Sequence, residues 1–495
     1  MSLKIAFQKD APKTVLCVGV HENSPLTCDP SCGDKTISDL LTKAVENSTF
    51  KGKLSQSLTV FTPAGQRLIL IGLGAKEDKK GNREIYWQKI GSAIACALEA
   101  AGCAEGTIDI HGEGEDDSFV LPNIALGALL RSWRFEKYFT KKKPDELFPV
   151  KQITFQTATL EAVEKAFAPL AIVAEGVFLT RGLVTEPANV VTPATLSLAA
   201  VGLQKAGITV EVLEEAELKK LGAGALLGVG QGSAHDSKLV VMRWEGGAKG
   251  EAPLAFVGKG VTFDSGGLSL KTASGMEDMK DDMGGAGVVI GLMQTLALRK
   301  AKVNCVGVIA LVENMPSSTA QRPGDVVKSL SGQTIEILNT DAEGRLILAD
   351  ALWYTQDRFK PKLMIDLATL TGAMVVCLGK DRAGLFATDD VLADNLLKAG
   401  ENVDELLWRL PLDESYDKEI NSKIADMQNI GSGRGAGSIT AAKFLQRFVN
   451  DVPWAHLDIA GVTLMDKDIP FAAKGATAFG VRLLNRFVAD NYERE

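Results

Sequence analysis

The sequence predicts an α/β fold with two domains: a smaller N-terminal α/β domain, and a larger C-terminal α/β domain with a central, largely parallel sheet covered by helices. The chain has 495 residues, which is more than a single domain usually contains. Hydrophobic residues make up 46% of it and charged residues 23%, as in ordinary globular proteins. In the C-terminal part, short apolar runs alternate with helical patterns, which is typical of parallel sheets whose strands are joined by helices.

The N-terminal domain is expected to cover residues 1–157. Its predicted elements are strands at 15–20, 67–73 and 107–111, a helix at 85–101, and a charged, proline-containing surface segment at 140–149. A linker helix is expected at 158–181, running from Leu160 to about residue 180. Pro169 predicts a kink or a break in this helix, because proline removes a backbone donor.

The C-terminal domain is expected to cover residues 182–495. Its predicted elements are strands at 239–244, 254–257, 303–311 and 363–367, and helices at 284–299 and 344–355. In sheets of this kind, ligands bind at the carboxyl ends of the strands. Polar residues that follow the apolar runs are therefore candidates for a functional site.

The composition excludes several classes of protein. Lys and Arg total 54 and Asp and Glu total 62, and the net charge of −8 does not favour a general binder of nucleic-acid phosphates. The seven cysteines are irregularly spaced, and their closest pair, Cys28 and Cys32, lacks the four ligands of a structural zinc site, so we expect reduced thiols.

The sequence also argues against export and membrane insertion. The N-terminus has no apolar core of signal-peptide length. The longest apolar candidate, 284–298, is interrupted by Gln294 and is shorter than the ~18 residues of a membrane span. We expect a cytoplasmic protein with no membrane partner.

Four segments place polar residues next to predicted strands or helices. They contain Lys259, Asp264 and Lys271 in a glycine-rich loop, Asp281 and Asp282 before a glycine pair, Asp341, Glu343 and Arg345 at alternating positions, and a Thr-Leu-Thr-Gly run at 369–372. The alternating positions would project to one side if the chain there is extended. Taken singly, each segment has an ordinary explanation: acids that cap a helix, a solvated lysine, or a surface ion pair before a helix.

Taken together, the four segments indicate a metal site. They gather carboxylates in apolar, glycine-rich sequence, where burial of several carboxylates requires compensating cations. Lysines and an arginine could compensate the charge, but divalent ions do so better. Ligation that is rich in carboxylates and lacks histidine favours Mn²⁺ and Mg²⁺, and is also compatible with Zn²⁺.

These segments resemble the motifs of a known family. The run Asn-Thr-Asp-Ala-Glu-Gly-Arg-Leu at 339–346 resembles the signature of the leucyl aminopeptidase (cytosol aminopeptidase) family. Supporting motifs occur in the same order at 257–260, 262–267, 282–285, 313–315, 322–325 and 369–372. The resemblance is strong over residues 180–495 and concerns only size and arrangement before them. It implies a metalloexopeptidase, a hydrolase that releases N-terminal amino acids, preferentially Leu and other apolar residues, from peptides.

The resemblance further implies two divalent metal ions per subunit, Mn²⁺ or Zn²⁺, with Mg²⁺ as a further candidate. By position, Asp264 and Glu343 would bridge both ions, Asp341 would complete one site, and Lys259 and Asp282 would complete the other. Asp282 is chosen over Asp281 because it directly precedes the Met-Gly-Gly motif. A lysine ligand must be neutral, and both desolvation and nearby metal charge lower the pKa of a lysine.

The remaining site residues also follow from the resemblance. Lys271, as an ammonium, would stabilise the negative charge of the tetrahedral intermediate. Arg345 would hold a bicarbonate ion that relays the proton of the attacking water. The apolar side-chain pocket maps onto Met279, Thr369 and Gly372, with the backbone of Leu370. Such a pocket discriminates between side chains by only about 1–3 kcal/mol, so broad specificity is expected.

Histidines and other glycine-rich segments are expected to have no cofactor role. His456 lies in an apolar run and is expected to be a hydrogen-bonded core residue. The glycine-rich run at 431–437 lacks the P-loop pattern, and residues 72–74 lack the third glycine of a dinucleotide fingerprint. This argues against a nucleotide-dependent oxidoreductase. By resemblance, the run at 431–437 is expected to line the active-site region.

The expected partners are peptides with a free N-terminus and, from the resemblance, further copies of the chain in a homohexamer. An alternative is an additional DNA-binding role, as an accessory factor in transcription or recombination, because bacterial relatives in the family also bind DNA. The segment 131–151 contains seven basic and three acidic residues, although an ordinary solvated linker surface would have the same pattern. Real DNA binding would weaken steeply with salt.

Overall fold

The computed structural model describes residues 3–12, 14–22, 35–76, 81–110, 115–143, 146–433 and 435–493. It divides into two compact units, Met1–Ala174 with Asp466–Gly475, and Glu175–Met465 with Ala476–Glu495. The two-domain α/β architecture is therefore confirmed. The domain limits expected at residues 157 and 181 stay a prediction, and the sequence did not indicate that residues 466–475 belong to the first unit.

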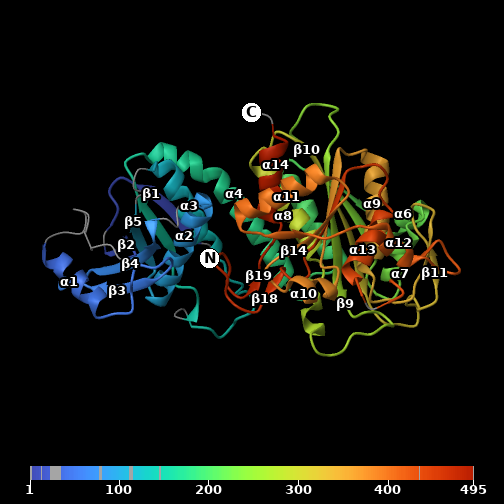
Figure 1. Cartoon of the computed structure of the whole chain (residues 1–495), viewed down its shortest axis with the longest axis horizontal. Coiled ribbons are helices and arrows are strands. Elements are labelled where there is room, and N and C mark those ends of the chain that lie inside the picture. Colours follow the sequence, from blue (N-terminus) through green and yellow to red (C-terminus); the bar gives the residue numbers. More distant parts are fainter. Residues whose placement is uncertain are drawn as a thin grey trace. The chain divides into compact units, whose positions relative to one another are not determined.

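The first unit contains a six-stranded sheet (Figure 1). Its strands are β1 (Lys4–Gln8), β2 (Val15–His21), β3 (Ser57–Phe61), β4 (Arg67–Gly74), β5 (Glu105–Asp109) and β6 (Gln152–Gln156), in the order β1-β6-β5-β2-β4-β3. Only the pairing of β3 with β4 is antiparallel. Its helices are α1 (Lys35–Glu46), α2 (Arg83–Ala100) and α3 (Asp117–Ser132). The predicted strands and helix are all present, but β5 ends at Asp109, and His111 lies outside the described residues.

Residues 466–475 pack on this first unit. Ser92 of α2 donates a hydrogen bond to the Pro470 carbonyl, and Arg131 of α3 pairs with Asp468. Phe471 and Ala472 are buried, with 6% and 2% of their surface exposed. Polar contacts thus hold the excursion against the first unit, and its apolar residues Phe471 and Ala472 are buried.

The helix α4 (Leu160–Thr185) carries the chain from the first unit to the second. It continues through Pro169, so the helix does not break there, and the alternative of a kink at Pro169 stays a prediction. Pro169 is exposed, and water can bond the carbonyl that the proline leaves without a donor. By length and composition alone α4 is long and apolar enough to cross a membrane, a test that core helices of soluble proteins also pass. α4 is therefore longer than residues 284–298, which the sequence indicated as the longest apolar segment.

The second unit contains an eight-stranded sheet in the order β15-β14-β17-β13-β9-β10-β8-β7. Its strands are β7 (Thr209–Leu213), β8 (Lys238–Glu245), β9 (Leu254–Asp264), β10 (Asn304–Asn314), β13 (Leu363–Ala368), β14 (Ala383–Ala387), β15 (Leu407–Arg409) and β17 (Trp454–Asp458). The four central strands, β17, β13, β9 and β10, are parallel, and antiparallel pairings occur outside them. The predicted largely parallel sheet is confirmed for this centre.

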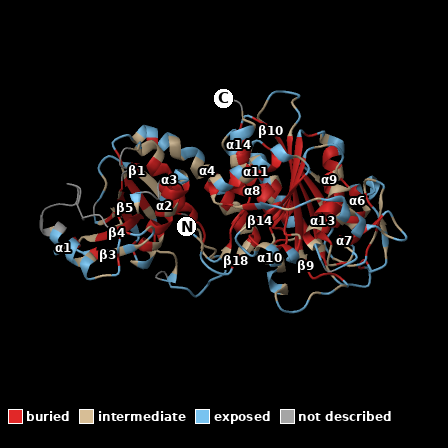
Figure 2. Cartoon of the chain, in the orientation of Figure 1, coloured by how far each residue is buried: buried red, intermediate tan, exposed pale blue. Residues whose placement is uncertain are grey.

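Helices cover both faces of this sheet, and its central strands are buried (Figures 1 and 2). One face carries α8 (Gly284–Leu298), α11 (Asp390–Val403) and α14 (Val481–Asn491), and the other carries α7 (Gly224–Gly230), α9 (Gly344–Phe359) and α13 (Gly437–Gln446). The remaining helices are α5 (Pro193–Val201), η4 (Gly202–Ala206), α6 (Glu215–Leu221), η5 (Met276–Asp281), α10 (Gly372–Leu378), α12 (Glu414–Asp417) and η6 (Lys418–Ile420). Two small sheets contain β11 (Val326–Lys328), β12 (Thr334–Glu336) and β16 (Met427–Gln428), and β18 (Leu464–Met465) with β19 (Gly475–Ala476).

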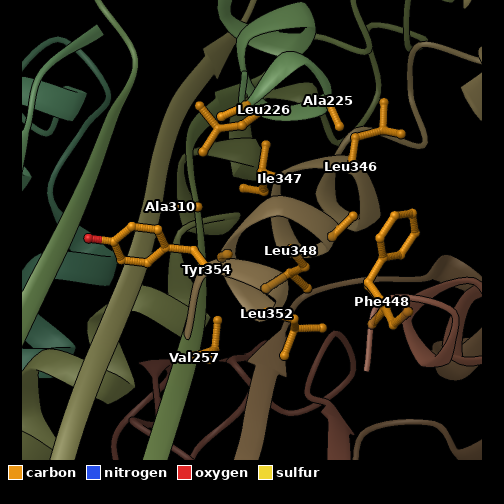
Figure 3. Packing of buried hydrophobic residues seen from close by; sticks show 14 of the residues in the cluster. Ala225, Leu226, Val257, Ala310, Leu346, Ile347, Leu348, Leu352, Tyr354 and Phe448 are labelled. Carbon is orange, nitrogen blue, oxygen red and sulfur yellow. The ribbon is translucent and has the colours of Figure 1, made fainter. Parts of the chain in front are cut away.

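A hydrophobic cluster fixes α9 on the sheet (Figure 3). Leu348 and Leu352 of α9 are fully buried in one cluster with Val257 of β9, Ala310 of β10 and Phe448. Each buried leucine contributes about 1.5–3 kcal/mol relative to an exposed one. This packing holds the first turn of α9 at the carboxyl edge of the parallel strands, which is where the site lies.

Candidate active site

The predicted site residues converge on the carboxyl edge of β9, β10 and β13. Lys259 lies inside β9 and Asp264 ends that strand. Lys271 follows in the next loop, and Asp282 directly follows η5. Asp341, Glu343 and Arg345 lie at the start of α9, and residues 369–372 follow β13.

Two local expectations are wrong. Lys259 lies in a strand instead of a glycine-rich loop, because its neighbouring glycines serve close packing: a Cβ at Gly258 would lie 2.7 Å from Cα of Ala286 in α8. The chain at 341–345 is not extended either. Glu343 is the N-cap of α9 and has helical angles, φ −81° and ψ −36°. The turn into α9, instead of strand alternation, directs these side chains to the site.

Three carboxylates form the centre of the site. Asp264, Asp341 and Glu343 each offer an oxygen atom, and these atoms lie within 4.8 Å of one another. Asp264 and Glu343 are buried, each with 2% of its surface exposed. Asp264 Oδ1 accepts hydrogen bonds from the Gly266 amide at 2.9 Å and from Asn314 Nδ2 at 2.8 Å, which fixes the orientation of the carboxylate.

Two lysines neutralise the carboxylates. Lys259 Nζ donates to Asp282 Oδ1 at 2.6 Å and to the Thr369 carbonyl at 2.7 Å, and lies 2.9 Å from Glu343 Oε1. Lys271 Nζ lies 2.7 Å from Asp264 Oδ2 and also pairs with Asp341. The five proposed metal ligands thus lie in one connected cluster.

The electrostatics of the cluster reflect its burial. Burial raises the pKa of Asp264, Asp282 and Asp341, although the lysines oppose this shift. Burial lowers the pKa of Lys259, but the surrounding carboxylates outweigh it, and the net pKa of Lys259 is raised. An assembly of carboxylates that is hard to ionise is one that bound cations stabilise.

The donor set fits a divalent metal. Asp282 Oδ2 is buried and has no hydrogen-bond partner among the residues that the structure describes. Buried acceptors without a partner are rare in folded proteins unless a water or an ion satisfies them. Together with the three clustered carboxylates, this free oxygen matches the oxygen-rich ligation of Mn²⁺, Mg²⁺ or Zn²⁺.

Arg345 offers a site for an anion. Its Nη1 donates to the Asn429 carbonyl at 2.7 Å, while its buried Nε has no partner within the described part of the chain. Burial lowers the pKa of Arg345 to about 10, but the guanidinium still carries its charge at neutral pH. Arg345 lines the cavity, and a charged guanidinium with an unpartnered N–H group is suited to an anion such as bicarbonate.

All the predicted site residues line one cavity of about 450 Å³. Its wall includes the metal-ligand candidates Lys259, Asp264, Asp282, Asp341 and Glu343, the residues Lys271 and Arg345, and the pocket residues Met279, Thr369, Leu370 and Gly372. Apolar side chains complete part of the wall, among them Ala373, Val375, Ile430 and Ala460. Gly437, at the end of the glycine-rich run, lines it too, while Arg434 in that run lies outside the described residues.

The sequence assigned no role to two residues that support the site, although Asn314 lies in the motif at 313–315. Asn314 orients Asp264, and Asp458 bonds the residues that follow β13. Both end parallel strands, so the rule that polar residues matter at carboxyl ends could have found them. Asp281 also lines the cavity, and burial together with Asp278 raises its pKa to about 7.

The structure describes His456 and five of the seven cysteines. His456 is fully buried and its Nδ1 lies 2.6 Å from Asp366 Oδ1, which confirms a hydrogen-bonded core residue. The described cysteines, Cys17, Cys96, Cys103, Cys305 and Cys377, are free. The pair Cys28 and Cys32 lies outside the described residues.

A cluster of buried carboxylates and lysines at the carboxyl edge of an α/β sheet, open to a cavity, is typical of a metal-dependent enzyme. Residues 178–485 match the model of the cytosol aminopeptidase family, catalytic domain, and residues 17–142 match the N-terminal domain of the same family. The chain therefore belongs to the cytosol aminopeptidase family. It is an aminopeptidase, a hydrolase of the metallopeptidase class.

Relatives and solved structures agree with this family. The chain is 50% identical to a probable cytosol aminopeptidase of Caulobacter vibrioides, over 97% of this chain and 96% of the relative. It is also 50% identical to one of Bradyrhizobium sp., over 99% of each chain. A mutant of tomato leucine aminopeptidase superposes with a TM-score of 0.86 at 33% identity, over 99% of this chain and 97% of that one. The bottromycin maturation enzyme BotP in complex with Mn gives a TM-score of 0.84 at 32% identity, over 97% and 99%.

Proposed function

We propose that the chain is a two-metal aminopeptidase that releases Leu and other apolar residues from the N-terminus of peptides. The observation that carries the proposal is the connected cluster of three carboxylates within 4.8 Å, beside Lys259 and the free Asp282 oxygen. Asp264 and Glu343 would bridge the two ions. Asp341 would complete one site, and Lys259 with Asp282 would complete the other.

The metal is proposed to be Mn²⁺ or Zn²⁺, with Mg²⁺ as a further candidate. The Mn complex of BotP supports Mn²⁺ by similarity. Lys259 can act as a ligand only after its ammonium loses a proton, and the positive charge of two ions would favour that loss. When bound, the ions would supply Lewis-acid activation of a water molecule and of the scissile carbonyl.

Lys271 and Arg345 would carry the remaining chemistry. The Lys271 side chain is 23% exposed, and Asp264 and Asp341 hold its ammonium at the wall of the cavity. From there the ammonium can donate to the oxygen that becomes negative in the tetrahedral intermediate. Arg345 would hold a bicarbonate ion, which would supply a proton acceptor for the attacking water.

The proposed substrate pocket is apolar. Met279, Thr369, Gly372 and the backbone of Leu370 would surround the N-terminal side chain of the peptide. The preference of such a pocket for Leu over smaller residues is worth about 1–3 kcal/mol, so several apolar residues should be accepted.

One experiment tests the metal and the chemistry together. The purified protein is analysed for metal content, and hydrolysis of leucinamide is measured before chelation, after chelation, and after the ion is restored. We expect about two ions per chain, loss of activity on chelation, and recovery with Mn²⁺ or Zn²⁺. Full activity in a metal-free protein would overturn the proposal.

We further propose a cytoplasmic location and a homohexamer, both on family similarity. Light scattering coupled to size-exclusion chromatography tests the assembly, for which we expect six copies of the 52.7 kDa chain. A monomer at micromolar concentration would contradict it.

DNA binding is the alternative role. The structure leaves fewer basic residues of the segment 131–151 available to contact DNA. Of the basic residues at 131–151, Arg131 is buried and pairs with Asp468, and Arg134 pairs with Glu99. Lys141, Lys142 and Lys143 are exposed and could contact phosphates. A gel-shift assay at low salt tests this role, and an unshifted DNA band would remove it.

A further inference from the structure

A buried carboxylate stands behind the wall of the cavity. Asp458 ends β17 and is fully buried. Its Oδ1 accepts hydrogen bonds from the amides of Leu370 and Ala460, each at 3.2 Å, and its Oδ2 accepts one from Thr371 Oγ1 at 2.7 Å. Asp458 therefore bonds two consecutive residues, Leu370 and Thr371, that line the cavity.

Thr371 extends this network to two helices. Its Oγ1 caps the N-terminus of α10 by accepting from the Met374 amide at 3.2 Å, and lies 2.6 Å from Ser438 Oγ of α13. The Thr371 hydroxyl donates its single proton to Asp458, so it must accept from Ser438. Every hydroxyl in the network thus has a defined direction, which makes Thr371 difficult to replace by an apolar residue.

The other end of the same segment is bonded to the carboxylate and lysine cluster. Thr369 accepts from Lys259 through its carbonyl and donates through Oγ1 to Asp282 Oδ1 at 2.8 Å. Residues 369–371 are therefore held at both ends. The Leu370 amide is used by Asp458, while the Leu370 carbonyl accepts no hydrogen bond from the described residues. That carbonyl is therefore free to accept a hydrogen bond, and Leu370 lines the cavity.

We propose that Asp458, Thr371 and Ser438 form a positioning network that holds the Leu370 carbonyl and the pocket wall in the orientation that binds peptide. The proposal rests on the proposed function, because it assumes that residues 369–372 contact the substrate. Loss of the network should weaken substrate binding and leave the metal cluster intact, since Asp458 contacts none of the proposed ligands.

The test compares a disrupting variant with a conservative one. Thr371→Val keeps the shape of the side chain and removes the hydroxyl, whereas Thr371→Ser keeps the hydroxyl. For Thr371→Val we expect KM for leucinamide and for a leucyl dipeptide to rise about tenfold, as for the loss of about 1.4 kcal/mol of binding, with kcat changed much less. Thr371→Ser should return KM to within about twofold of the wild type. Ser438→Ala, which removes one bond of the network, should give a smaller rise.

Asp350 provides a matched control. It is also a buried carboxylate of the second unit, and it accepts from the amides of Leu226 at 2.8 Å and Leu330 at 2.7 Å, but it does not line the cavity. Asp350→Asn should change the melting temperature and leave KM unchanged. Metal content and calorimetric binding of free leucine are measured on every variant, and we expect normal metal content and weaker leucine binding in Thr371→Val.

The outcomes distinguish a failure of the proposed function from a failure of the positioning network. An inactive wild-type protein would overturn the proposed function itself. An active wild-type protein whose Thr371→Val and Ser438→Ala variants keep wild-type KM and leucine affinity would overturn only the positioning network. A KM rise of equal size in Asp350→Asn, or a Thr371→Ser variant as impaired as Thr371→Val, would show general destabilisation and would also overturn it.

Discussion

Gly285 provides a sharp test of how the helix positions the site. It lies in the first turn of α8, where a Cβ atom would lie 2.0 Å from the Leu367 carbonyl oxygen and 2.9 Å from the Lys259 amide nitrogen. Both obstacles are backbone atoms of the sheet, which cannot turn aside as a side chain would. We predict that Gly285→Ala pushes the N-terminal end of α8 away from β9 and β13.

The structure sets the size of this displacement. Real Cβ atoms essentially never approach closer than 3.0 Å, so the new Cβ and the Leu367 oxygen must separate by at least 3.0 − 2.0 = 1.0 Å. Overpacking of this kind lowers the free energy of unfolding by about 1–3 kcal/mol. Asp282 lies three residues before Gly285, so the displacement reaches a proposed metal ligand, and a misplacement of about 1 Å can cost about 10²-fold in rate.

Denaturant unfolding and kcat/KM for leucinamide measure the two effects separately. Gly182→Ala in α4 is the matched control, because a Cβ there has no heavy atom within 4 Å. That control should raise the free energy of unfolding by about 0.4–1 kcal/mol and leave activity unchanged. A Gly285→Ala protein with wild-type stability and wild-type turnover would refute the reasoning.

Four further substitutions test the site and the core. Asp264→Ala or Glu343→Ala should abolish metal content and activity together, and full turnover with retained metal in either variant would contradict the ligand assignment. Lys271→Ala should keep the metals and lose roughly 10²–10³ in rate, as for the loss of one oxyanion donor, and a normal rate would exclude Lys271 from the mechanism. Leu352→Ala in the core of α9 should lower the free energy of unfolding by about 2–5 kcal/mol, measured in urea, and a loss below 1 kcal/mol would show that this cluster does not fix α9.

The order of strands and helices was predictable because each buried element carries its own apolar pattern. The runs at 254–257 and 363–367 fall within β9 and β13, and the predicted helix at 284–299 matches α8. What could not be predicted were effects of distant packing. Gly258 was interpreted as part of a loop, but α8 packs against it in a strand, and nothing in the local sequence distinguishes the two situations.

The site residues also divide into those that the local sequence predicts and those that depend on distant packing. The ligand candidates lie in contiguous sequence motifs, so the sequence was sufficient to identify them. The structure places all of them in the wall of one cavity. The network of Asp458, Thr371 and Ser438 depends on the alignment of β17 beside β13, which pairs Asp458 with Ala368. Strand alignment of this kind arises from the folded sheet, and the residues involved lie up to 87 positions apart.

The packing of residues 466–475 on the first unit has a practical consequence for dissecting the protein. A fragment that starts after residue 174 would keep this excursion but lose its supporting surface, and Phe471 would face water. Such a fragment would be prone to aggregate for a reason unrelated to its catalytic fold. β18 and β19 pair with each other. A short hairpin turn that joins Met465 to Ala476 should therefore remove the exposed excursion 466–475 and yield a soluble catalytic fragment.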